Sequence, residues 1–598
     1  MAKGFVPRLF PRDLTVGDST EDIELFAPGY VEARPENSST ITPLTDESST
    51  TYLDWRTLNK RNIPQSQGAR LLLYPKVEGV HIRPYAGNGS FGPWIDVKVK
   101  DKPTPAKVLI VTPGPTDVGC VVTFLDALFG FYFDPRHDTV YLSSRTERTI
   151  SITNASEDES YNIKAGGGEE LSLGTWDLVV AGESILEILV LERKDWSITQ
   201  ESKKRAGSED SSSSKKLKLS DSRGVLAEPS LSLTKNENSL VKLKQGMKVC
   251  VGPREMGYWL TRLDTIFEDA YCAVWRARHS SEPEIDIVVK VLKIHHHEGH
   301  WIAHYAKKWT QEYTIHSYFD HPSIIRLLGY DARFHSLYLE NIDAKALSQL
   351  VTSDFKFTGS LGDAQRIMEN LASALAHVHG KDIIHADIKP GNVLFSPYRG
   401  AVLTNFGLSF QEGNQDSSAG CGTPWYVPPE FAGNGGIGSP KADVWALGVV
   451  MLWLLKIMRL PETICKAWNL RHINPKGTSP EAHEAAKAAM LKWHRVIRTM
   501  RKAIVQQNTT KLAQLVVRTL HPEESDRIDA ETLSQELRNL RLSPSKDSKT
   551  PKPAQQGVHG TASNPERATT VCTPTNASHL SSKKRDFDNG PGNRLPRM

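Results

Sequence analysis

Residues 383–395 read IIHADIKPGNVLF, and this stretch decides the fold of the chain. The apolar residues at its two ends predict short strands, and the residues between them predict a tight loop. That loop carries four polar side chains, His385, Asp387, Lys389 and Asn392. Polar groups held between buried strands cost free energy unless they are paired or used in chemistry. We therefore predict that this loop belongs to the functional site.

The spacing H-x-D-x-K-x-x-N resembles the catalytic loop of eukaryotic protein kinases, with Ala386 in place of the usual arginine. A lysine two residues after the aspartate is the serine/threonine kinase version. The resemblance implies phosphoryl transfer, in which the protein mainly positions groups and neutralises charge. It implies that Asp387 orients the substrate hydroxyl and accepts its proton, that Lys389 neutralises the moving phosphate, and that Asn392 holds a metal ion.

Further residues match the ATP site of that family. Lys290 lies in DIVVKVLK, and an inward-pointing lysine among valines needs a carboxylate partner. Glu312 precedes the segment HPSI by nine residues, which is the family spacing for that partner. The alternative is a surface lysine whose stem lies along apolar residues. In LYLENI, the resemblance implies that Leu339 is the gatekeeper and that Glu340 and Ile342 belong to the hinge that meets adenine.

Two departures from the family pattern stand out. The three glycine positions of the phosphate-binding loop are Phe267, Asp269 and Cys272, and Asp269 adds negative charge there. Asn405 replaces the aspartate of Asp-Phe-Gly, which holds Mg²⁺ in the family. Mg²⁺ favours charged carboxylate oxygens, and an amide has no net charge. Two functions therefore stay open: a serine/threonine kinase that is weak or atypical in its use of ATP with Mg²⁺ or Mn²⁺, and a pseudokinase that acts as a scaffold or allosteric partner.

The segment GTPWYVPPE at residues 422–430 resembles the end of a kinase activation segment. In the family, the residue matching Thr423 bonds to the catalytic aspartate and lysine, and the residue matching Glu430 pairs with a late arginine, here Arg527. Asp443 opens an apolar run and is expected to bond back to the catalytic loop.

Two serines of the activation segment, Ser417 and Ser418, are candidate phosphorylation sites. Because Ala386 replaces the usual arginine, activation by a phosphate–arginine pair at that site is disfavoured.

Ahead of this region, short apolar or alternating runs separated by turn residues predict a β-sandwich over residues 66–195. Its second half resembles the last strands of forkhead-associated domains, which bind phosphothreonine, although the Gly-Arg and Ser-x-x-His elements of their phosphate pocket are missing. Arg145 and Arg148, near Ser143 and Ser144, are candidates for an anion site, and exposed strand-edge charges are the alternative. A third functional hypothesis makes this module a phosphopeptide reader with the kinase-like domain as its accessory.

Composition narrows the class of protein. A chain of 598 residues needs two or more domains, and its net charge of +4 gives no strong nucleic-acid signal. The six cysteines form no C-x-x-C pair, which favours a reducing compartment. The first residues contain no apolar run long enough for a signal peptide, so we expect none there, and the longest apolar run, residues 444–455, is short for a membrane span.

Two basic clusters lie in a Ser-rich segment and resemble a bipartite nuclear import signal: Lys203, Lys204, Arg205, Lys215, Lys216 and Lys218. A solvated linker is the alternative. We expect a nuclear protein, or one shared between nucleus and cytoplasm.

The predicted fold class is α+β, with a bilobal protein-kinase-like domain behind a β-sandwich, and the expected partners are protein substrates. The predicted boundaries are 1–65 disordered, 66–195 β-sandwich, 196–245 linker, 250–541 kinase domain and 542–598 disordered tail. Helices are predicted at 301–319, 364–379, 444–455 and 480–507.

Overall fold

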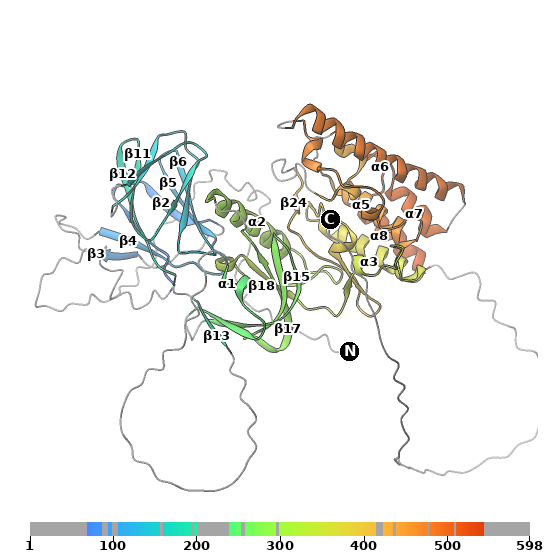
Figure 1. Cartoon of the computed structure of the whole chain (residues 1–598), viewed down its shortest axis with the longest axis horizontal. Coiled ribbons are helices and arrows are strands. Elements are labelled where there is room, and N and C mark those ends of the chain that lie inside the picture. The colour runs from blue at the N-terminus through green and yellow to red at the C-terminus, as the bar shows by residue number, and fades with distance from the viewer. Residues whose placement is uncertain are drawn as a thin grey trace, which may run out of the picture. The chain divides into compact units, whose positions relative to one another are not determined.

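The computed structural model describes residues 68–85, 92, 94–97, 106–155, 159–193, 196–200, 238–252, 257–294, 298–413, 422–433, 438–475, 478–507 and 510–542 (Figure 1). The segments predicted to be disordered at both ends, most of the predicted linker with its basic clusters, and Ser417 and Ser418 lie outside these residues. Within them, no helix is long and apolar enough to cross a membrane.

The first part of the structure consists of two antiparallel sheets (Figure 1). One sheet has the order β3 (Trp94–Val97), β4 (Ala106–Val111), β1 (Leu71–Pro75), β12 (Glu183–Val190), β11 (Gly174–Val180), β8 (Ile150–Asn154) and β9 (Glu159–Ile163). The other has the order β10 (Gly168–Leu171), β7 (Val140–Ser144), β6 (Ala127–Phe133), β5 (Gly119–Phe124) and β2 (Val80–Pro84).

The two sheets share one hydrophobic core. Phe129 and Leu142 of one sheet and Ile152 and Ile188 of the other are all fully buried in the same cluster. The alternation of buried and half-exposed residues along β8 matches the period of a strand with one face in the core. Two sheets that enclose a common core in this way form a β-sandwich, as the sequence predicts.

The second part begins with a seven-stranded antiparallel sheet. Its order is β13 (Trp196–Gln200), β14 (Met247–Val251), β15 (Tyr258–Glu268), β16 (Cys272–His279), β17 (Glu282–Leu292), β19 (Ser336–Glu340) and β18 (Leu327–Asp331). The short helix α1 (Ser239–Lys242) precedes β14, and the long helix α2 (His300–Ser317) follows β17. This is the sheet-and-helix lobe expected at the start of a bilobal domain.

The predicted linker, residues 196–245, differs from the structure at both of its ends, because β13 and α1 lie within it. Trp196 pairs with Val251 and Gln200 with Met247 across the edge of the sheet. The partner strand lies about fifty residues away in the sequence, so a local pattern of five residues gave no sign of the pairing.

The remaining lobe is mainly helical. Its helices are α3 (Leu361–His379), α5 (Pro440–Leu454), α6 (Pro480–Gln506), α7 (Lys511–Thr519) and α8 (Ala530–Leu542). Two small sheets complete it, one formed by β20 (Lys345–Ala346), β22 (Val393–Ser396) and β23 (Gly400–Leu403), the other by β21 (Ile383–Ile384) and β24 (Phe410–Gln411). The helices predicted at 364–379 and 480–507 are confirmed, and the first of them begins three residues earlier.

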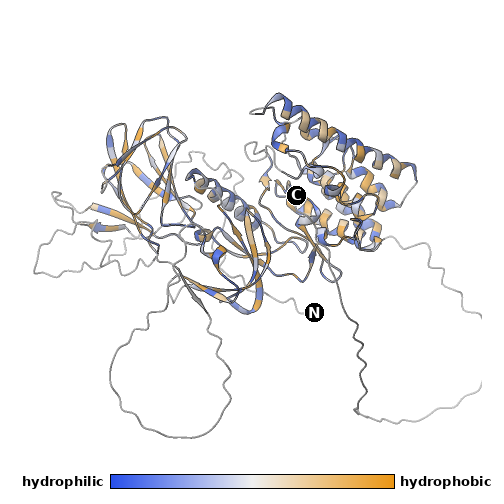
Figure 2. Cartoon of the chain, viewed as in Figure 1, coloured by the Kyte–Doolittle hydropathy of each residue, from blue (hydrophilic) through white to orange (hydrophobic). Residues whose placement is uncertain are grey.

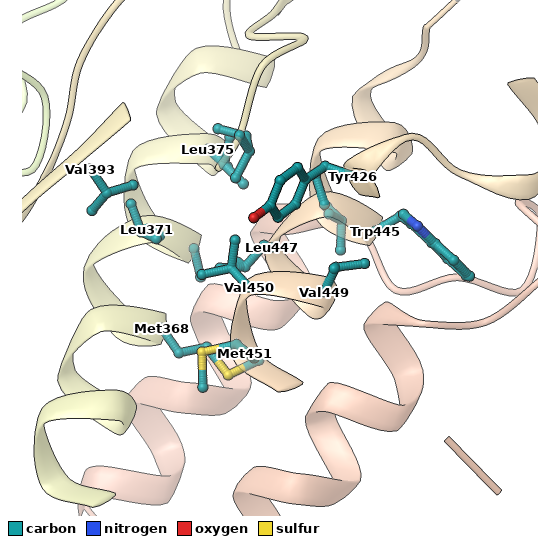
Figure 3. Packing of buried hydrophobic residues seen from close by; sticks show 14 of the residues in the cluster. Met368, Leu371, Leu375, Val393, Tyr426, Trp445, Leu447, Val449, Val450 and Met451 are labelled. Atoms are coloured by element: carbon teal, nitrogen blue, oxygen red, sulfur yellow. The ribbon is translucent and has the colours of Figure 1, made fainter. Parts of the chain in front are cut away.

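Helix α5 is the centre of this lobe, and every residue from Asp443 to Leu454 is buried. Figure 3 shows Met368 and Leu371 of α3 pointing toward Met451 and Val450 of α5. At Gly448 a side chain would lie 2.8 Å from Leu520, so glycine permits the close approach of the residues that end α7. The lobe thus has a buried apolar centre, and the polar loops are attached to it.

Helix α6 carries hydrophobic and hydrophilic residues along its whole length (Figure 2). Ser479 caps it by accepting a hydrogen bond from the Ala482 backbone N–H, and Pro480 occupies its first turn. Met490, Trp493 and Ile497 are buried at helical spacing. The helix therefore packs into the lobe core, as predicted for a late helix of the domain.

Candidate active site

The loop between β21 and β22 is fixed to the buried helix α5. The carboxylate of Asp443 accepts hydrogen bonds from the backbone N–H groups of His385, at 2.8 Å, and Ala386, at 2.9 Å. Ala386 has a left-handed backbone conformation with φ of 64°, which non-glycine residues rarely adopt. The buried Asp443 carboxylate offsets that strain and fixes the loop just before Asp387.

Asp387 lies in this loop with 4% of its surface exposed. Its Oδ1 accepts a hydrogen bond from the Thr423 hydroxyl at 2.6 Å, and its Oδ2 accepts one from Asn392 Nδ2 at 2.7 Å. The Lys389 ammonium lies 2.8 Å from the same carboxylate and donates to Thr423 Oγ1 at 2.9 Å. Charge-assisted bonds of this kind are strong and directional, so the carboxylate has one orientation. The structure thus brings together the three predicted catalytic residues and Thr423.

A second polar group joins the two lobes. Lys290 Nζ lies 2.5 Å from the buried Glu312 carboxylate of α2, so the expected partner is in place. Lys290 also donates to Asn405 Oδ1 at 3.0 Å, and Asn405 Nδ2 donates to Asn392 Oδ1 at 3.1 Å. Only this orientation of the Asn405 amide satisfies both neighbours, because a lysine can only donate. A continuous chain of hydrogen bonds therefore runs from Glu312 to the catalytic loop.

Sequence reasoning gave no role to the buried aromatic rings next to these hydrogen bonds. Phe406 packs against His385 on one side and His316 of α2 on the other, with ring centroids 5.0 Å apart in both contacts. Burial lowers the pKa of both histidines, so they stay neutral. His316 Nε2 lies 2.7 Å from the Ile325 carbonyl oxygen and His385 Nε2 lies 3.1 Å from that of Thr404. This buried stack connects α2 to the catalytic loop through side chains distant in sequence.

The loop between β15 and β16 is held by hydrogen bonds to one of its own carboxylates. Asp269 Oδ1 accepts hydrogen bonds from the backbone N–H groups of Tyr271 and Cys272, both at 2.8 Å. Lys293 donates to Glu268 Oε1 at 2.7 Å and to the Asp269 carbonyl oxygen at 2.9 Å. A glycine-rich loop offers its N–H groups to phosphate, whereas here a carboxylate of the loop already uses two of them.

The tip of the same hairpin is apolar and exposed. Ile266, Phe267 and Tyr271 are 52%, 51% and 63% exposed. Burial raises the pKa of the neighbouring Cys272 to about 11, so its thiol stays protonated and uncharged. The tip therefore lacks the small, flexible residues that let a backbone approach phosphates closely.

The predicted hinge residues lie at the end of β19. Leu339 pairs with Val288 of β17 and is half-buried between the two lobes' hydrophobic cores. The Glu340 carboxylate accepts a hydrogen bond from the Arg326 N–H at 3.0 Å, and Ile342 packs against the core of the helical lobe. This places the three residues at the junction between the lobes.

The structural marks of the activation segment are also present. Arg527 is buried and donates two hydrogen bonds to Glu430, at 2.6 and 2.9 Å. The guanidinium of Arg527 also lies 5.1 Å from the centre of the Trp445 ring. Arg527 thus connects the end of the activation segment, at Glu430, to Trp445 of α5.

The candidate anion residues of the sandwich differ in their exposure and in their contacts. Arg148 pairs with Asp126 at 2.6 Å, and Ser144 is fully buried. Ser143 is half-buried on the same strand, and Arg145 is exposed at its end. A phosphopeptide cannot reach the Ser144 hydroxyl without opening the strand.

Comparison with known proteins agrees with this geometry. Residues 263–537 match the family model of the protein kinase domain. An Aurora/IPL1-related protein kinase 2 of Caenorhabditis briggsae is 36% identical over 142 residues, which is 23% of this chain and 46% of the relative. An Aurora kinase of Dictyostelium discoideum is 31% identical over 220 residues, 35% of this chain and 55% of the relative. A CBL-interacting protein kinase 9 of Oryza sativa subsp. japonica is 28% identical over 234 residues, 36% of this chain and 48% of the relative.

These matches span about half the length of the relatives. The matched residues include the whole catalytic loop and the Lys290–Glu312 pair. The β-sandwich lies outside the region that the family model matches.

Proposed function

We propose that this chain transfers the γ-phosphate of ATP to serine or threonine hydroxyls of protein substrates, since residues 263–537 match the family model of the protein kinase domain. The observation that carries the proposal is the environment of Asp387. Its carboxylate is buried, hydrogen-bonded on both oxygens, and flanked by the Lys389 ammonium. An acceptor held in one orientation is what a substrate hydroxyl needs when it attacks phosphorus.

The roles follow from charge and position. Asp387 accepts the proton of the substrate hydroxyl, and Lys389 offsets negative charge on the transferred group. Lys290, held by Glu312, contacts the phosphates of the substrate ATP, and the hinge residues Leu339, Glu340 and Ile342 border its adenine. These assignments rest on the preceding contacts and on the general demands of phosphoryl transfer, which is mostly positioning and electrostatic stabilisation.

A divalent metal fits this site poorly. Mg²⁺ or Mn²⁺ would supply positive charge to bound phosphates, and the side-chain oxygens of Asn392 and Asn405 would have to hold it. Here Asn405 turns an N–H group toward Asn392 Oδ1, so the side chains of these two candidate ligands are already hydrogen-bonded to each other. The other Asn405 atom, Oδ1, already accepts from Lys290. Within the described residues, no cluster of three histidine, cysteine, aspartate or glutamate side chains is arranged as a metal site.

The same contacts favour a second candidate function, that of a pseudokinase acting as a scaffold or allosteric partner. The chain of hydrogen bonds from Glu312 to Asn392 keeps the lobes in a kinase-like arrangement without any ligand. The loop that closes on Asp269 weakens the phosphate site further. We rank this function second, because it leaves the fixed orientation of Asp387 without a use.

Phosphate transfer from labelled ATP to a mixed protein substrate tests the proposal. The full chain is assayed with Mg²⁺ and with Mn²⁺, beside Asp387→Ala and a matched surface variant, Asp354→Ala, whose carboxylate lies in an exposed turn. We expect slow transfer that Asp387→Ala abolishes and Asp354→Ala leaves unchanged. Equal transfer by the parent and Asp387→Ala would refute the role of this carboxylate.

We also propose nuclear import through the basic clusters at residues 203–205 and 215–218. A further basic cluster lies near the end of the sequence, at Lys583, Lys584 and Arg585. A fluorescent fusion that lacks this cluster, and has the six basic residues at 203–205 and 215–218 changed to alanine, should lose its nuclear enrichment. An unchanged distribution would contradict the proposal.

A further inference from the structure

Helix α2 is buried on two sides. Its Glu312 faces Lys290 and the candidate active site, while Ile302 and Ala306, earlier in the helix, belong to a second hydrophobic cluster. That cluster contains buried residues of both the kinase lobe and the β-sandwich. Its sandwich members are Tyr85, Val118, Val121, Tyr132 and Tyr141, and its kinase members are Ile302, Ala303, Ala306, Trp309, Tyr313, Ala332 and Leu337. The outer face of α2 therefore packs against the sandwich as part of one core.

Polar contacts close the same boundary. The Ala332 backbone N–H donates to the Pro115 carbonyl oxygen at 2.8 Å. Arg193, just after β12, donates to the Arg333 carbonyl oxygen at 2.9 Å, and its guanidinium lies 4.7 Å from the centre of the Phe334 ring. These bonds join the sandwich to the turn between β18 and β19, so the contact involves the lobe as well as the helix.

A helix moves as a rigid body, so its outer contacts affect its inner ones. Tyr141 and Glu170 of the sandwich lie against the start of α2 at Gly299, and Glu312 lies further along the same helix. A shift of α2 that moves its start away from the sandwich must also change the 2.5 Å distance between Glu312 and Lys290. Two packed faces thus define one position of the helix.

We propose that the β-sandwich is a positioning module of the ATP site: its contact with α2 holds Glu312 on Lys290. Tyr141, which lies against the start of α2, acts as a positioning residue, since it does not lie at the reacting atoms. The inference rests on the proposed function for its consequence in catalysis, whereas the position of α2 is a property of the protein without substrate. Separating the sandwich from α2 therefore lowers the affinity for ATP by opening the ion pair.

Gly299, the residue directly before α2, offers a selective perturbation. A side chain added there would lie 2.6 Å from Glu170 Cγ and 2.7 Å from Tyr141 Cδ2, both on the sandwich. The backbone of Gly299 is right-handed helical, with φ of −58°, so a larger residue fits its own lobe. Gly362, near the start of α3, is the matched control, because a side chain there meets only Ser360 Oγ at 3.6 Å. Gly299→Leu thus acts on the boundary between the domains.

The test compares Gly299→Leu, Gly362→Leu and the double variant Gly299→Leu/Tyr141→Ala in the full chain. Hydrogen exchange of the α2 amides is measured without nucleotide, and affinity is measured with a fluorescent ATP analogue. We expect faster α2 exchange and about tenfold weaker ATP binding in Gly299→Leu alone. Removal of the Tyr141 ring makes room for the leucine and should restore both quantities to within about threefold of the parent.

Unchanged α2 exchange in Gly299→Leu would overturn the inference, and so would an equal rise of α2 exchange in the control Gly362→Leu. If Gly299→Leu fails to fold, Tyr141→Ala alone decides, with faster α2 exchange supporting the inference and parental exchange overturning it. If the variants show the expected differences in α2 exchange but the parent transfers no phosphate, the proposed function is refuted and the positioning role of the sandwich stands.

Discussion

Asn405→Asp changes one amide into a carboxylate at the centre of the active site. In the parent, Asn405 Nδ2 lies 3.1 Å from Asn392 Oδ1, and Oδ1 lies 3.0 Å from Lys290 Nζ. The substitution turns the first contact into two facing acceptor oxygens and strengthens the second by charge. Without a metal, Asn392 Oδ1 loses its donor, which costs about 1–3 kcal/mol for a buried group.

In the variant, the new carboxylate and Asn392 could hold a divalent cation, which would remove that cost and would add positive charge where phosphates bind. One preorganised electrostatic contact in an active site contributes about 10²–10³ to the rate, or about 2.7–4 kcal/mol. We therefore expect transfer by Asn405→Asp in Mg²⁺ to exceed that of the parent by at least about a hundredfold. We also expect the melting temperature of the variant, measured with an ATP analogue that cannot transfer phosphate, to rise with Mg²⁺ concentration, since binding to the native state stabilises it.

The control is Asn370→Asp, which makes the same chemical change outside the candidate active site. There the Asn370 side-chain oxygen accepts a hydrogen bond from the Ala401 backbone N–H. The reasoning is refuted if Asn405→Asp shows neither a gain in transfer nor a Mg²⁺-dependent rise in melting temperature. In that case the hydrogen bond between the two amides would not be what limits metal binding.

Three further outcomes are expected. Thr423→Val removes the hydroxyl that donates to Asp387, so kcat should fall about tenfold with KM for ATP unchanged, measured by steady-state transfer; a change in KM alone would contradict this. Arg527→Met leaves the Glu430 carboxylate without its two hydrogen bonds and should lower the free energy of unfolding by about 3 kcal/mol in urea titrations, whereas an unaltered value would show the pair to be dispensable. Burial lowers the pKa of His494 from 6.5 to about 4, so the unfolded chain binds a proton that the native state refuses as pH falls below about 6.5. The stability that this group contributes above pH 6.5, about 3 kcal/mol, is then lost as the pH falls toward 4. In urea titrations, His494→Gln should therefore lose correspondingly less stability than the parent between pH 7 and 4. An equal loss in both proteins would show that His494 is not the cause of the acid destabilisation.

The sequence predicted the parts of the fold that local patterns encode. The period of apolar residues located α3 and α6, and the alternation of short runs located the sandwich. Spacing within the catalytic loop brought Asp387, Lys389 and Asn392 together correctly, because a short loop between two anchored strands leaves its side chains few directions.

Contacts between distant segments were beyond that reasoning. β13 pairs with a strand about fifty residues later, and the ring stack around Phe406 joins three separate segments. The orientation of the Asn405 amide depends on Lys290 and Asn392 together, and neither lies near it in the sequence. The hydrophobic cluster that contains Trp309 includes residues of both the sandwich and the kinase lobe. The periodicity within either domain does not show how the two domains pack against each other.

The most direct test of the central claim measures phosphate transfer in Mg²⁺ by Asn405→Asp and by Asn405→Asp/Asp387→Ala. This comparison asks whether the catalytic loop works once the metal position carries a charge, and it does not depend on detecting slow transfer by the parent. We predict clear transfer to serine or threonine by the first variant and none by the second, because Asp387 is the only carboxylate proposed to accept the hydroxyl proton. Equal rates in the two variants, or no transfer by either, would contradict the account of this domain as a kinase.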